Sequence, residues 1–490
     1  MVFLLLRPSL LHPGTLHDAF SYPPRRLAGR HRGVRMTARR IAVVGSGIAG
    51  LSAAWRLSHE PGTAVTLFEA GDYFGGHTHT VDVELPDHTG RGVRHGVDTG
   101  FLVFNQRTYP ELIRLFDHLG VATAASDMSF SVQSTVDGVE WSGSNLASVF
   151  AQPRNLLRPR FIGMLAQIVR FNRLATRIAV DGSEAELAES VGDFLDRHGF
   201  GTAFRRWYLL PMVACIWSCP TDQMLEFPIA TLIRFCHNHG LLQVVDRPQW
   251  YTVSGGALHY VERMLPAIAD ARLNTPVLGV SRQALGVTLL SAAGSEHFDA
   301  VVLACHSDQA LALLGADATP AEREVLGAIA YHPNVAVLHT DTALLPKRGR
   351  AWAAWNYEHA ADGGDEGVCL HYLLNRLQPL PFARPVIVSL NPVRAPQPDQ
   401  VLARYDYAHP VFDLAAVVAQ RRLPGLQGQR HTWFAGAWAG YGFHEDGLKS
   451  GLAAAQGLIR RLHGRHEHLA SVSPFTVTQA EPAGGTRLAA

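Results

Sequence analysis

The chain contains 490 residues, of which 47% are hydrophobic, and it carries a formal net charge of +1. This length exceeds what one simple core usually holds, so we expect two interleaved domains. The near-zero charge argues against a nucleic-acid partner, and no unbroken apolar run reaches the length of about 18 residues that indicates a membrane-spanning helix.

The first segment, residues 1–38, predicts a disordered extension. It is rich in proline and arginine and lacks clear hydrophobic periodicity. Its apolar piece VFLLL is too short for the core of a signal peptide. We therefore expect the folded chain to begin near Met36.

Residues 39–70 contain the first motif that predicts a ligand. The apolar run IAVV leads into GSGIAG, followed by the helical pattern LSAAWRL and the strand AVTLFE. In such a unit Gly45 permits the tight turn, Gly47 lets the backbone approach a pyrophosphate, and Gly50 lets the helix pack closely on the strand. The helix N-terminus favours the pyrophosphate charge. Glu69, about 20 residues further on, predicts a hydrogen bond to a ribose hydroxyl, which disfavours NADP.

Three later stretches favour FAD over NAD. The doublet Gly75-Gly76 can bring a second loop close to the diphosphate or ribityl chain. The segment LNTPVLGVSRQALGVTLL predicts a strand pair, and FDAVVLACHSDQAL predicts the buried strand that follows it. Near the C-terminus the strand TWFAGA meets a glycine-rich loop and a helix whose N-terminus can stabilise a reduced flavin.

The region between these blocks is the candidate for the substrate-binding part. Residues 106–120 and most of 153–240 show helical periodicity, and SFSVQSTVDGVEWSG predicts a hairpin that turns at DG. Large apolar side chains in the helical part are candidates for an apolar tunnel, although core packing is the more common explanation for any single one of them. They are Trp207, Tyr208, Met212 and Trp217.

Residues 154–178 combine apolar residues at helical spacing with six arginines and no acid. The apolar residues of this pattern are Phe161, Met164, Leu165, Ile168, Val169, Phe171, Leu174 and Ile178. The pattern is typical of a core helix with a solvated arginine face, and also of a helix that docks on an anionic membrane surface. Peripheral membrane contact through this segment is therefore a hypothesis.

Four further segments in the second half predict strands of a substrate-domain sheet: VAVLHTDTALLP, AWAAWNY, GVCLHYLLNRLQ and PVIVSLNP. Candidate pocket residues on these strands are Trp355, Tyr357, His371 and Tyr372. The polar residues 466–490 that end the chain predict a disordered tail.

Among the 25 histidines, His444 is the one candidate for proton transfer, because it lies in the loop that enters the C-terminal helix. Imidazole has a suitable pKa range for a general acid or base, and Glu445 is placed to orient it. Asp446 can instead simply cap the helix.

The five cysteines do not indicate a disulfide framework, because their number is odd and their spacing irregular. Zinc would need a set such as Cys215, Cys219, Cys236, His237 and His239. We expect no metal site, since no C-x-x-C or H-E-x-x-H motif occurs.

The stretches GGHTHT, VDTGFLVFN, RPQWYTVSGGALHYV, LLNRLQ and FAGAWAGYGFHEDGLKSG together resemble the flavin-containing amine oxidase superfamily. This group includes monoamine and polyamine oxidases, protoporphyrinogen oxidase and phytoene desaturase. The chain is most similar to its bacterial FAD-dependent oxidoreductases, known as predicted NAD/FAD-binding proteins. The resemblance covers roughly residues 39–465 and implies one FAD per chain.

The resemblance also implies which residues hold the cofactor. They are Gly45, Ser46, Gly47, Ile48, Ala49 and Gly50 around the pyrophosphate, Glu69 at the adenosine ribose, Gly75, Gly76 and His77 beside the diphosphate and ribityl chain, Thr99, Gly100 and Phe101 at the isoalloxazine, Val277 at the adenine, and Gly436, Asp446, Gly447 and Leu448 in the C-terminal flavin block.

Two departures from the family pattern bear on function. Ala437 stands where many amine oxidases carry glutamate, and neither Lys347 nor Lys449 sits where a lysine would hold a water near flavin N5. We therefore favour hydride transfer to flavin N5 from a hydrophobic, lipid-like substrate, an acyl chain or isoprenoid. Members of the resembling subgroup are often encoded beside cyclopropane-fatty-acid-synthase-like methyltransferases. The alternatives are an amine oxidase that uses O2 and a flavoprotein with structural or non-redox, isomerase-type FAD.

These observations predict an α/β fold, a doubly wound Rossmann-like FAD-binding domain with an inserted α+β substrate domain. The FAD-binding segments are expected at 39–105, 246–325 and 426–465, the mainly helical part of the substrate domain at 106–245, and its sheet at 326–425. We expect a cytoplasmic protein, with contact to the inner membrane face as a further hypothesis.

Overall fold

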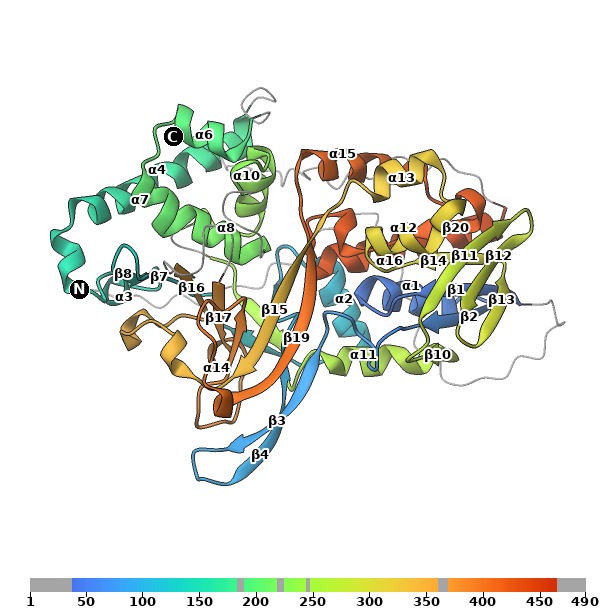
Figure 1. The fold of residues 1–490 in the computed structure, drawn as a ribbon, viewed down its shortest axis with the longest axis horizontal. Coiled ribbons are helices and arrows are strands. Elements are labelled where there is room, and N and C mark those ends of the chain that lie inside the picture. The colour runs from blue at the N-terminus through green and yellow to red at the C-terminus, as the bar shows by residue number, and fades with distance from the viewer. Residues whose placement is uncertain (1–37, 183–188, 218–223, 244–246, 360–368, 465–490) are drawn as a thin grey trace, which may run out of the picture.

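A computed structural model describes residues 38–182, 189–217, 224–243, 247–359 and 369–464. The predictions for residues 1–37 and 466–490 and for Cys219 therefore fall outside the described residues. The described chain forms two lobes, one with a parallel sheet and adjoining helices, the other with a large mixed sheet below a group of helices (Figure 1). None of the described helices is both long and apolar enough to cross a membrane.

A five-stranded parallel sheet forms the centre of the first lobe. Its strands are short apolar runs, and such runs are typical of parallel strands covered on both faces. In sheet order they are β10 (Asp270–Arg272), β2 (Thr63–Phe68), β1 (Arg39–Val44), β14 (Ala300–Leu303) and β20 (Thr432–Phe434). The predicted strands IAVV, AVTLFE, FDAVVL and TWFAGA thus all lie in one sheet.

The two faces of this sheet are covered differently. Ile41 and Val43 of β1 share a core with α1 (Ile48–Ser58) and α16 (His444–Leu462). Ala42 and Val44 face the other core. There the antiparallel strands β11 (Val277–Gln283), β12 (Gly286–Ser291) and β13 (Gly294–Phe298) pack on the sheet, with α12 (Ser307–Leu314) against β11. The predicted α/β class and parallel sheet are confirmed. The sheet is not covered by helices alone on both faces, as in a doubly wound fold, because the chain between β10 and β14 forms hairpins rather than a helical crossover.

Helices α1 and α16 pack so closely that glycine is required at their crossing. A Cβ atom on Gly451 would lie 2.0 Å from the carbonyl oxygen of Ala49. The Ser52 hydroxyl donates to that same oxygen (3.0 Å) and contacts the carbonyl of Leu448 (3.4 Å). The N-termini of the two helices are thereby held next to each other.

The second lobe contains a seven-stranded sheet. Its order is β19 (Val401–Pro410), β15 (Tyr331–His339), β18 (Ile387–Leu390), β17 (Cys369–Leu373), β16 (Trp355–His359), β7 (Phe130–Ser134) and β8 (Val139–Ser142). All four strands predicted in the second half are confirmed, as is the hairpin that turns at Gly138, whose φ is +57°.

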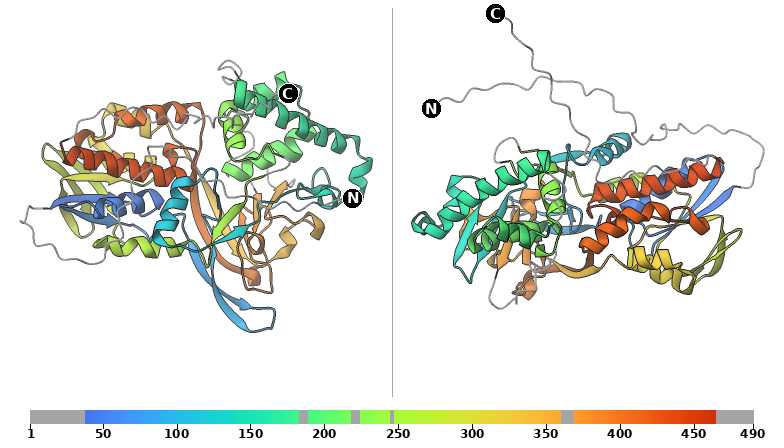
Figure 2. Two further views of the ribbon diagram at one scale, coloured as in Figure 1. Left: turned by 180° about the vertical axis from the view of Figure 1, so that it is seen from behind. Right: turned by 90° about the horizontal axis from the view of Figure 1, so that it is seen from above.

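The helical group that lies above this sheet confirms the helical periodicity of the middle region (Figure 2). Its members are α4 (Pro159–Asp181), α6 (Val191–Arg197), α7 (Thr202–Phe204), α8 (Leu210–Trp217) and α10 (Ile229–Asn238). The helix predicted over 106–120 is α2 (Pro110–Leu119), which has a proline in its first turn, where the missing N–H costs nothing.

A buried carboxylate joins the two lobes. Asp98 ends the projecting hairpin of β3 (Thr80–Pro86) and β4 (Gly92–Asp98) (Figure 1). It accepts hydrogen bonds from the Thr80 hydroxyl (2.5 Å), the Ala257 backbone N–H (2.9 Å) and the Gln378 side-chain amide (2.6 Å). Burial raises the pKa of Asp98 to about 6 although these donors oppose the shift. The carboxylate fixes the chain immediately before Thr99, Gly100 and Phe101.

Asp98→Asn is expected to lower the free energy of unfolding by about 1–3 kcal/mol, because the new NH2 group must face a donor and leaves it without an acceptor. Asp82→Asn on the same hairpin is the matched control: it removes a surface ion pair with Arg94, which contributes at most about 1 kcal/mol. Urea denaturation near neutral pH measures both. Equal losses for the two variants would contradict the structural role of Asp98.

Candidate active site

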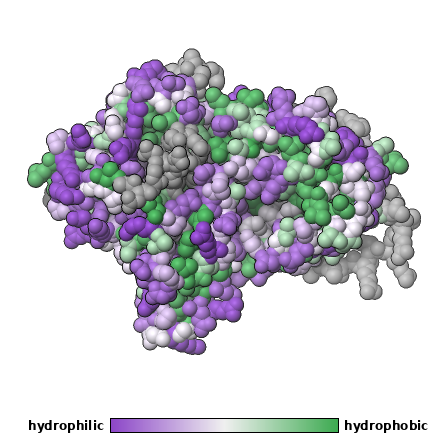
Figure 3. Space-filling model, viewed as in Figure 1, coloured by the Kyte–Doolittle hydropathy of each residue, from purple (hydrophilic) through white to green (hydrophobic). Residues whose placement is uncertain are grey.

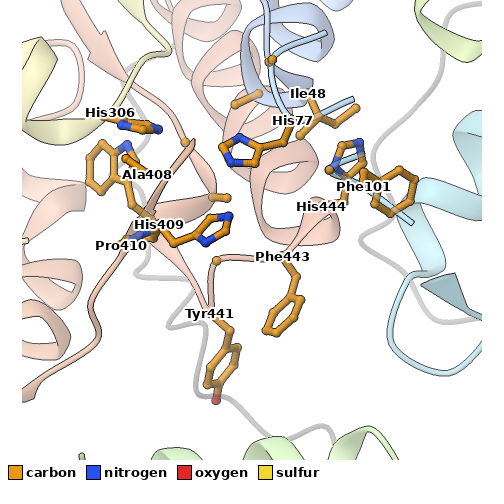
Figure 4. A pocket seen from close by; sticks show the side chains of 18 of the residues that line it. Ile48, His77, Phe101, His306, Ala408, His409, Pro410, Tyr441, Phe443 and His444 are labelled. Carbon is orange, nitrogen blue, oxygen red and sulfur yellow. The ribbon is translucent and has the colours of Figure 1, made fainter. Parts of the chain in front are cut away.

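A cavity of about 770 Å³ lies where the two lobes meet. Glycine-rich turns and the N-terminal ends of α1 and α16 line one end, and aromatic and aliphatic side chains from the second lobe line the other. Figure 4 shows part of the wall, with His77 and His409 close together and the stacked rings of Phe101 and His444 to one side. We refer to the two parts as the glycine end and the apolar end.

The glycine turn before α1 forms the wall of the glycine end. Gly45 has a φ of +97°, and a Cβ there would lie 2.8 Å from the carbonyl oxygen of Ala304. A Cβ on Gly50 would lie only 1.8 Å from the Gly45 carbonyl oxygen. In contrast, a Cβ on Gly47 would meet no protein atom within 4 Å. Gly45 and Gly50 are therefore needed for packing, whereas Gly47 leaves open space for a ligand in front of the helix N-terminus.

The carboxylate of Glu69, which follows β2, ties this turn to two other loops. One oxygen accepts from the backbone N–H (2.9 Å) and hydroxyl (2.5 Å) of Ser46, and the other accepts from the N–H of Gly71 (2.8 Å). The Ser46 hydroxyl oxygen in turn accepts from the N–H of Gly75 (3.2 Å). An ionised carboxylate has further acceptor sites, so the predicted bond to a ribose hydroxyl is compatible with these contacts.

His77 brings an unsatisfied polar atom to the cavity. The loop that carries it lies against the glycine turn, since a Cβ on Gly76 would be 3.0 Å from the Cα of Gly47. The Nε2 atom of His77 is buried and has no hydrogen-bond partner among the described residues. Burial, with neighbouring histidines, holds the pKa of His77 well below its usual range, so the ring is neutral near pH 7. An unpaired buried nitrogen indicates a missing ligand group.

His409, which the sequence did not single out, lies 5.2 Å from His77 between ring centres. The Asn334 side-chain amide donates to Nδ1 of His409 (3.1 Å), and Asn391 fixes that amide by donating to its oxygen (2.7 Å). Because Nδ1 accepts, the proton of the neutral ring is on Nε2. Burial, with His306 and His332, lowers the pKa of His409 to about 4. No sequence motif marks this residue, because its partners come from distant strands.

The C-terminal block contributes both lining and support. Gly436 lines the cavity, whereas Leu448 is fully buried and a Cβ on Gly447 would lie 2.7 Å from the side chain of Ile48. The Asp446 carboxylate accepts from the N–H groups of Tyr441 (3.1 Å) and Phe443 (3.0 Å), so the capping alternative is confirmed. Burial raises the pKa of Asp446 to about 6.

His444 and Glu445 have different partners from those we expected. The His444 ring lines the cavity and stacks on Phe101 (3.8 Å between centres), and its Nε2 lies 2.7 Å from the Tyr260 hydroxyl. Burial lowers its pKa to about 3, below the range expected for a general acid or base at neutral pH. Glu445 does not orient His444; its carboxylate accepts from the first N–H groups of α2, at Glu111 (3.1 Å) and Leu112 (2.9 Å).

The predicted cofactor residues fall into two groups. Those that line the cavity are Gly45, Ser46, Gly47, Ile48, Ala49, Glu69, Gly75, Gly76, His77, Gly100, Phe101, Val277 and Gly436. Those that lie behind the lining are Gly50, Thr99, Asp446, Gly447 and Leu448. The first group converges from six separate stretches of the chain, and the open face at Gly47 and the unpaired His77 nitrogen fit a bound FAD.

The apolar end agrees in part with the predicted pocket residues. Met212, Trp217, Trp355 and Tyr372 line it, whereas Trp207, Tyr208, Tyr357 and His371 do not. The structure adds aromatic residues that sequence patterns did not reveal, because they come from six segments spread along the chain: Tyr109, Phe130, Phe235, Trp250, Phe412, Tyr441 and Phe443. Neither lysine of the chain lines the cavity; Lys347 is exposed and Lys449 pairs with Glu445 (3.0 Å).

A second buried polar cluster lies in the seven-stranded sheet. Glu358, Cys369 and His371 bring their ligand atoms within 4.8 Å of one another. The His371 ring is held at both nitrogens, by Glu358 (3.0 Å) and the Ser389 hydroxyl (2.6 Å), and Arg394 donates to the other oxygen of Glu358 (3.0 Å). With a guanidinium already paired to its carboxylate, this cluster is a closed ion-pair network, and we assign it no metal.

Comparison with known proteins places these features in a family. A sequence profile of the flavin-containing amine oxidoreductases matches residues 48–372. No curated protein matches the sequence. Solved structures with this fold include cyclohexylamine oxidase from Brevibacterium oxydans IH-35A, which is 17% identical with a TM-score of 0.63 and covers 87% of this chain and 100% of its own. A CLA-producing fatty acid isomerase from P. acnes is 16% identical with a TM-score of 0.59, over 86% and 99% of the two chains. Putrescine oxidase bound to putrescine is 17% identical with a TM-score of 0.60, again over 86% and 99%.

Gly47→Ala is expected to weaken FAD binding by about tenfold or more, because its methyl group occupies ligand space while the backbone, at φ −59°, tolerates alanine. Gly163→Ala on exposed α4 is the matched control, since its Cβ also meets no atom within 4 Å. Quenching of FAD fluorescence by the cofactor-free proteins measures the affinity. Unchanged binding by Gly47→Ala would mean that the ligand does not approach this turn.

The pH dependence of stability tests the neutral histidines. The pKa of His409 falls from 6.5 to about 4 on folding, so between these values the unfolded chain binds a proton that the folded chain does not. Stability is therefore lost as the pH falls through this window, by about 2 kcal/mol between pH 6.5 and 5 for this one group.

His409→Gln is expected to reduce that pH-dependent loss by about the same 2 kcal/mol in the cofactor-free protein. His88→Gln, on the exposed turn between β3 and β4, should leave the loss unchanged. Urea denaturation at the two pH values measures the difference. A pH profile of His409→Gln identical to that of the unsubstituted protein would show that His409 is not held neutral.

Proposed function

The chain belongs to the family of flavin-containing amine oxidoreductases and is an FAD-dependent oxidoreductase, and from this premise we propose that it oxidises a hydrophobic, lipid-like substrate, an acyl chain or an isoprenoid. Bound FAD would accept a hydride from a substrate C–H at its N5 atom. The chain's own residues would bind the substrate, orient it and exclude water.

The chemical character of the apolar end is the observation that carries this proposal. Among the described residues that line the cavity, Glu69 is the one charged side chain other than histidine, and it lies at the glycine end. The walls of the apolar end are aromatic and aliphatic. A neutral chain gains free energy from burial against such walls, whereas an ammonium ion would lose its hydration with no carboxylate to replace it.

One polar atom in the apolar end suits an acyl substrate. The indole N–H of Trp355 is buried and has no acceptor among the described residues. The ring stands edge-on to Tyr372 (4.9 Å between centres), so its position is fixed by packing. A carbonyl or carboxyl oxygen of the substrate would accept this hydrogen bond and remove the cost of leaving a buried donor unpaired.

His444 is proposed to hold a proton at the cavity wall in its neutral form, as a hydrogen-bond donor to the substrate and not as a base. Its ring lies at the cavity wall on Phe101, and the Tyr260 hydroxyl is within hydrogen-bond distance of its Nε2.

We also propose that the parallel-sheet lobe, from residues 39–105, 246–325 and 426–465, is a Rossmann-like FAD-binding domain. Residues 106–245 and 326–425 would then form the inserted substrate domain.

Amine oxidation is the second candidate function. The aromatic side chains of the apolar end support it, because rings can bind an ammonium group through their faces. Cyclohexylamine oxidase and putrescine oxidase have this fold, as does a fatty acid isomerase, which supports a third candidate, isomerisation without net oxidation. The three candidates differ in what reduces the flavin.

Anaerobic mixing of the purified holoprotein with long-chain acyl esters should bleach the visible flavin band, and mixing with cyclohexylamine or putrescine should not. Ile216→Asp places a charge in the apolar end and is expected to slow lipid-dependent bleaching at least about tenfold. Ile216→Val is the conservative control and should react normally. His444→Phe keeps the stack on Phe101 but removes the ring nitrogens. It should slow lipid-dependent bleaching, and an unchanged rate would show that the proton on His444 has no role.

Amine-dependent bleaching with peroxide release on admission of air would overturn the proposal in favour of amine oxidation. Conversion of a lipid without net bleaching, only when FAD is reduced, would favour the isomerase. Retained FAD in each variant establishes that the fold is intact.

A further inference from the structure

The outer surface of helix α4 has an apolar stripe that the core does not use. The inward face of α4 is formed by Phe161, Met164, Phe171 and Ile178, each at most 1% exposed. Most of the apolar spacing that suggested membrane docking in the sequence is therefore the core face of the helix. Of the apolar residues in that pattern, Val169 alone is an exposed large hydrophobic residue, and the exposed stripe adds other residues to it.

Ile162, Val169 and Val180 form this stripe, with 43%, 43% and 65% of their surface exposed. Because an α-helix has 3.6 residues per turn, their spacing places them on one line along the helix, opposite the core face. The turn that precedes α4, η1 (Pro153–Leu157), extends the stripe with Leu157, which is 87% exposed. We call these four residues the α4 patch.

Arginines accompany the α4 patch along the helix, and the first acid beyond them is the exposed Asp181, next to Val180. No acid occurs between residues 154 and 180, and Arg160 and Arg173 are exposed there. Arg170 is less available, since its guanidinium lies 4.6 Å from the centre of the Phe200 ring and donates to the carbonyl of His198. The acidic residues Glu140 and Asp137 on the adjoining β7–β8 hairpin form ion pairs with other arginines. Glu140 pairs with Arg348 (3.1 Å), and Asp137 lies 3.7 Å from Arg206.

We propose that the α4 patch docks on the surface of a bilayer that contains anionic lipids. Exposed leucine, isoleucine and valine side chains would enter the boundary between headgroups and acyl chains, and the arginines would contact anionic headgroups. In the surface view, the side of the molecule where α4 lies is mainly hydrophilic, with scattered hydrophobic side chains (Figure 3). A second copy of this chain is a poorer occupant, because symmetric pairing would bring two arginine-rich faces together.

The docking surface is also connected to the cavity through packed helices. Helix α4 packs against α10, whose Phe235 lines the apolar end, and α10 is adjacent to His239 of the same wall. The proposal goes beyond the proposed substrate class and does not depend on it.

Cosedimentation of the holoprotein with phosphatidylcholine vesicles containing about 30% phosphatidylglycerol tests the proposal without any turnover. Leu157→Ser/Ile162→Ser should weaken vesicle affinity at least about tenfold, because two apolar anchors are lost. Arg160→Glu/Arg173→Glu should weaken it similarly, and more so at low salt. All four side chains are exposed, so retained FAD and an unchanged unfolding midpoint are expected.

Leu278→Ser/Leu285→Ser is the matched control, since these leucines are 60% and 85% exposed on the β11–β12 hairpin at the opposite end of the molecule (Figure 1). It should bind vesicles as the unsubstituted protein does. Absence of binding to the anionic vesicles, or equal binding by the patch and control variants, would overturn the proposal. Sedimentation velocity showing a dimer that Leu157→Ser/Ile162→Ser converts to monomers would instead assign the patch to self-association.

Discussion

The hydrogen bonds around the Glu69 carboxylate hold the glycine end in shape. Through Ser46 and Gly71 this one side chain connects the turn before α1, the end of β2 and the loop that carries Gly75 and His77. Because the carboxylate takes up their N–H groups, the amides at the start of α1 are left for a ligand.

The glycine end is built to receive an anion without any cation in its wall. His77, His306 and His409 all have lowered pKa values because they are buried, so they offer neutral N–H or nitrogen groups. No arginine or lysine is among the described residues of the lining. The favourable potential for a pyrophosphate therefore comes from helix dipoles and backbone amides. Away from this end the cavity becomes apolar, and this gradient would orient a substrate relative to the cofactor.

Local features of the sequence predicted much of this arrangement. The strand, turn and helix around Gly45, the acid at Glu69 and the helix that begins near His444 are contiguous patterns whose geometry follows from backbone conformation. The strands of the second lobe were equally recognisable from their alternating residues. The cofactor itself was indicated by the glycine turn together with the C-terminal block, since either alone is ambiguous.

What could not be predicted depends on contacts between distant segments. The sheet β11–β13 covers a face where helices were expected, because a hairpin pattern does not state which surface it covers. The partner of Glu445 is the start of α2, more than 300 residues away, so its capping role was hidden behind the adjacent His444. In α4 both faces are partly apolar, and only the packing against α7, α10 and their neighbours distinguishes the core face from the exposed one.

We infer that the segments connected by Glu69, together with the C-terminal helix α16, bind one whole dinucleotide. Titration of the cofactor-free protein with FAD and with FMN, followed by flavin fluorescence, tests it most directly. We predict one FAD per chain and an affinity for FMN at least about 100-fold lower, because FMN lacks the adenosine half that we expect to lie at Glu69 and Val277. Equal affinity for the two flavins, or no uptake of either, would contradict the account.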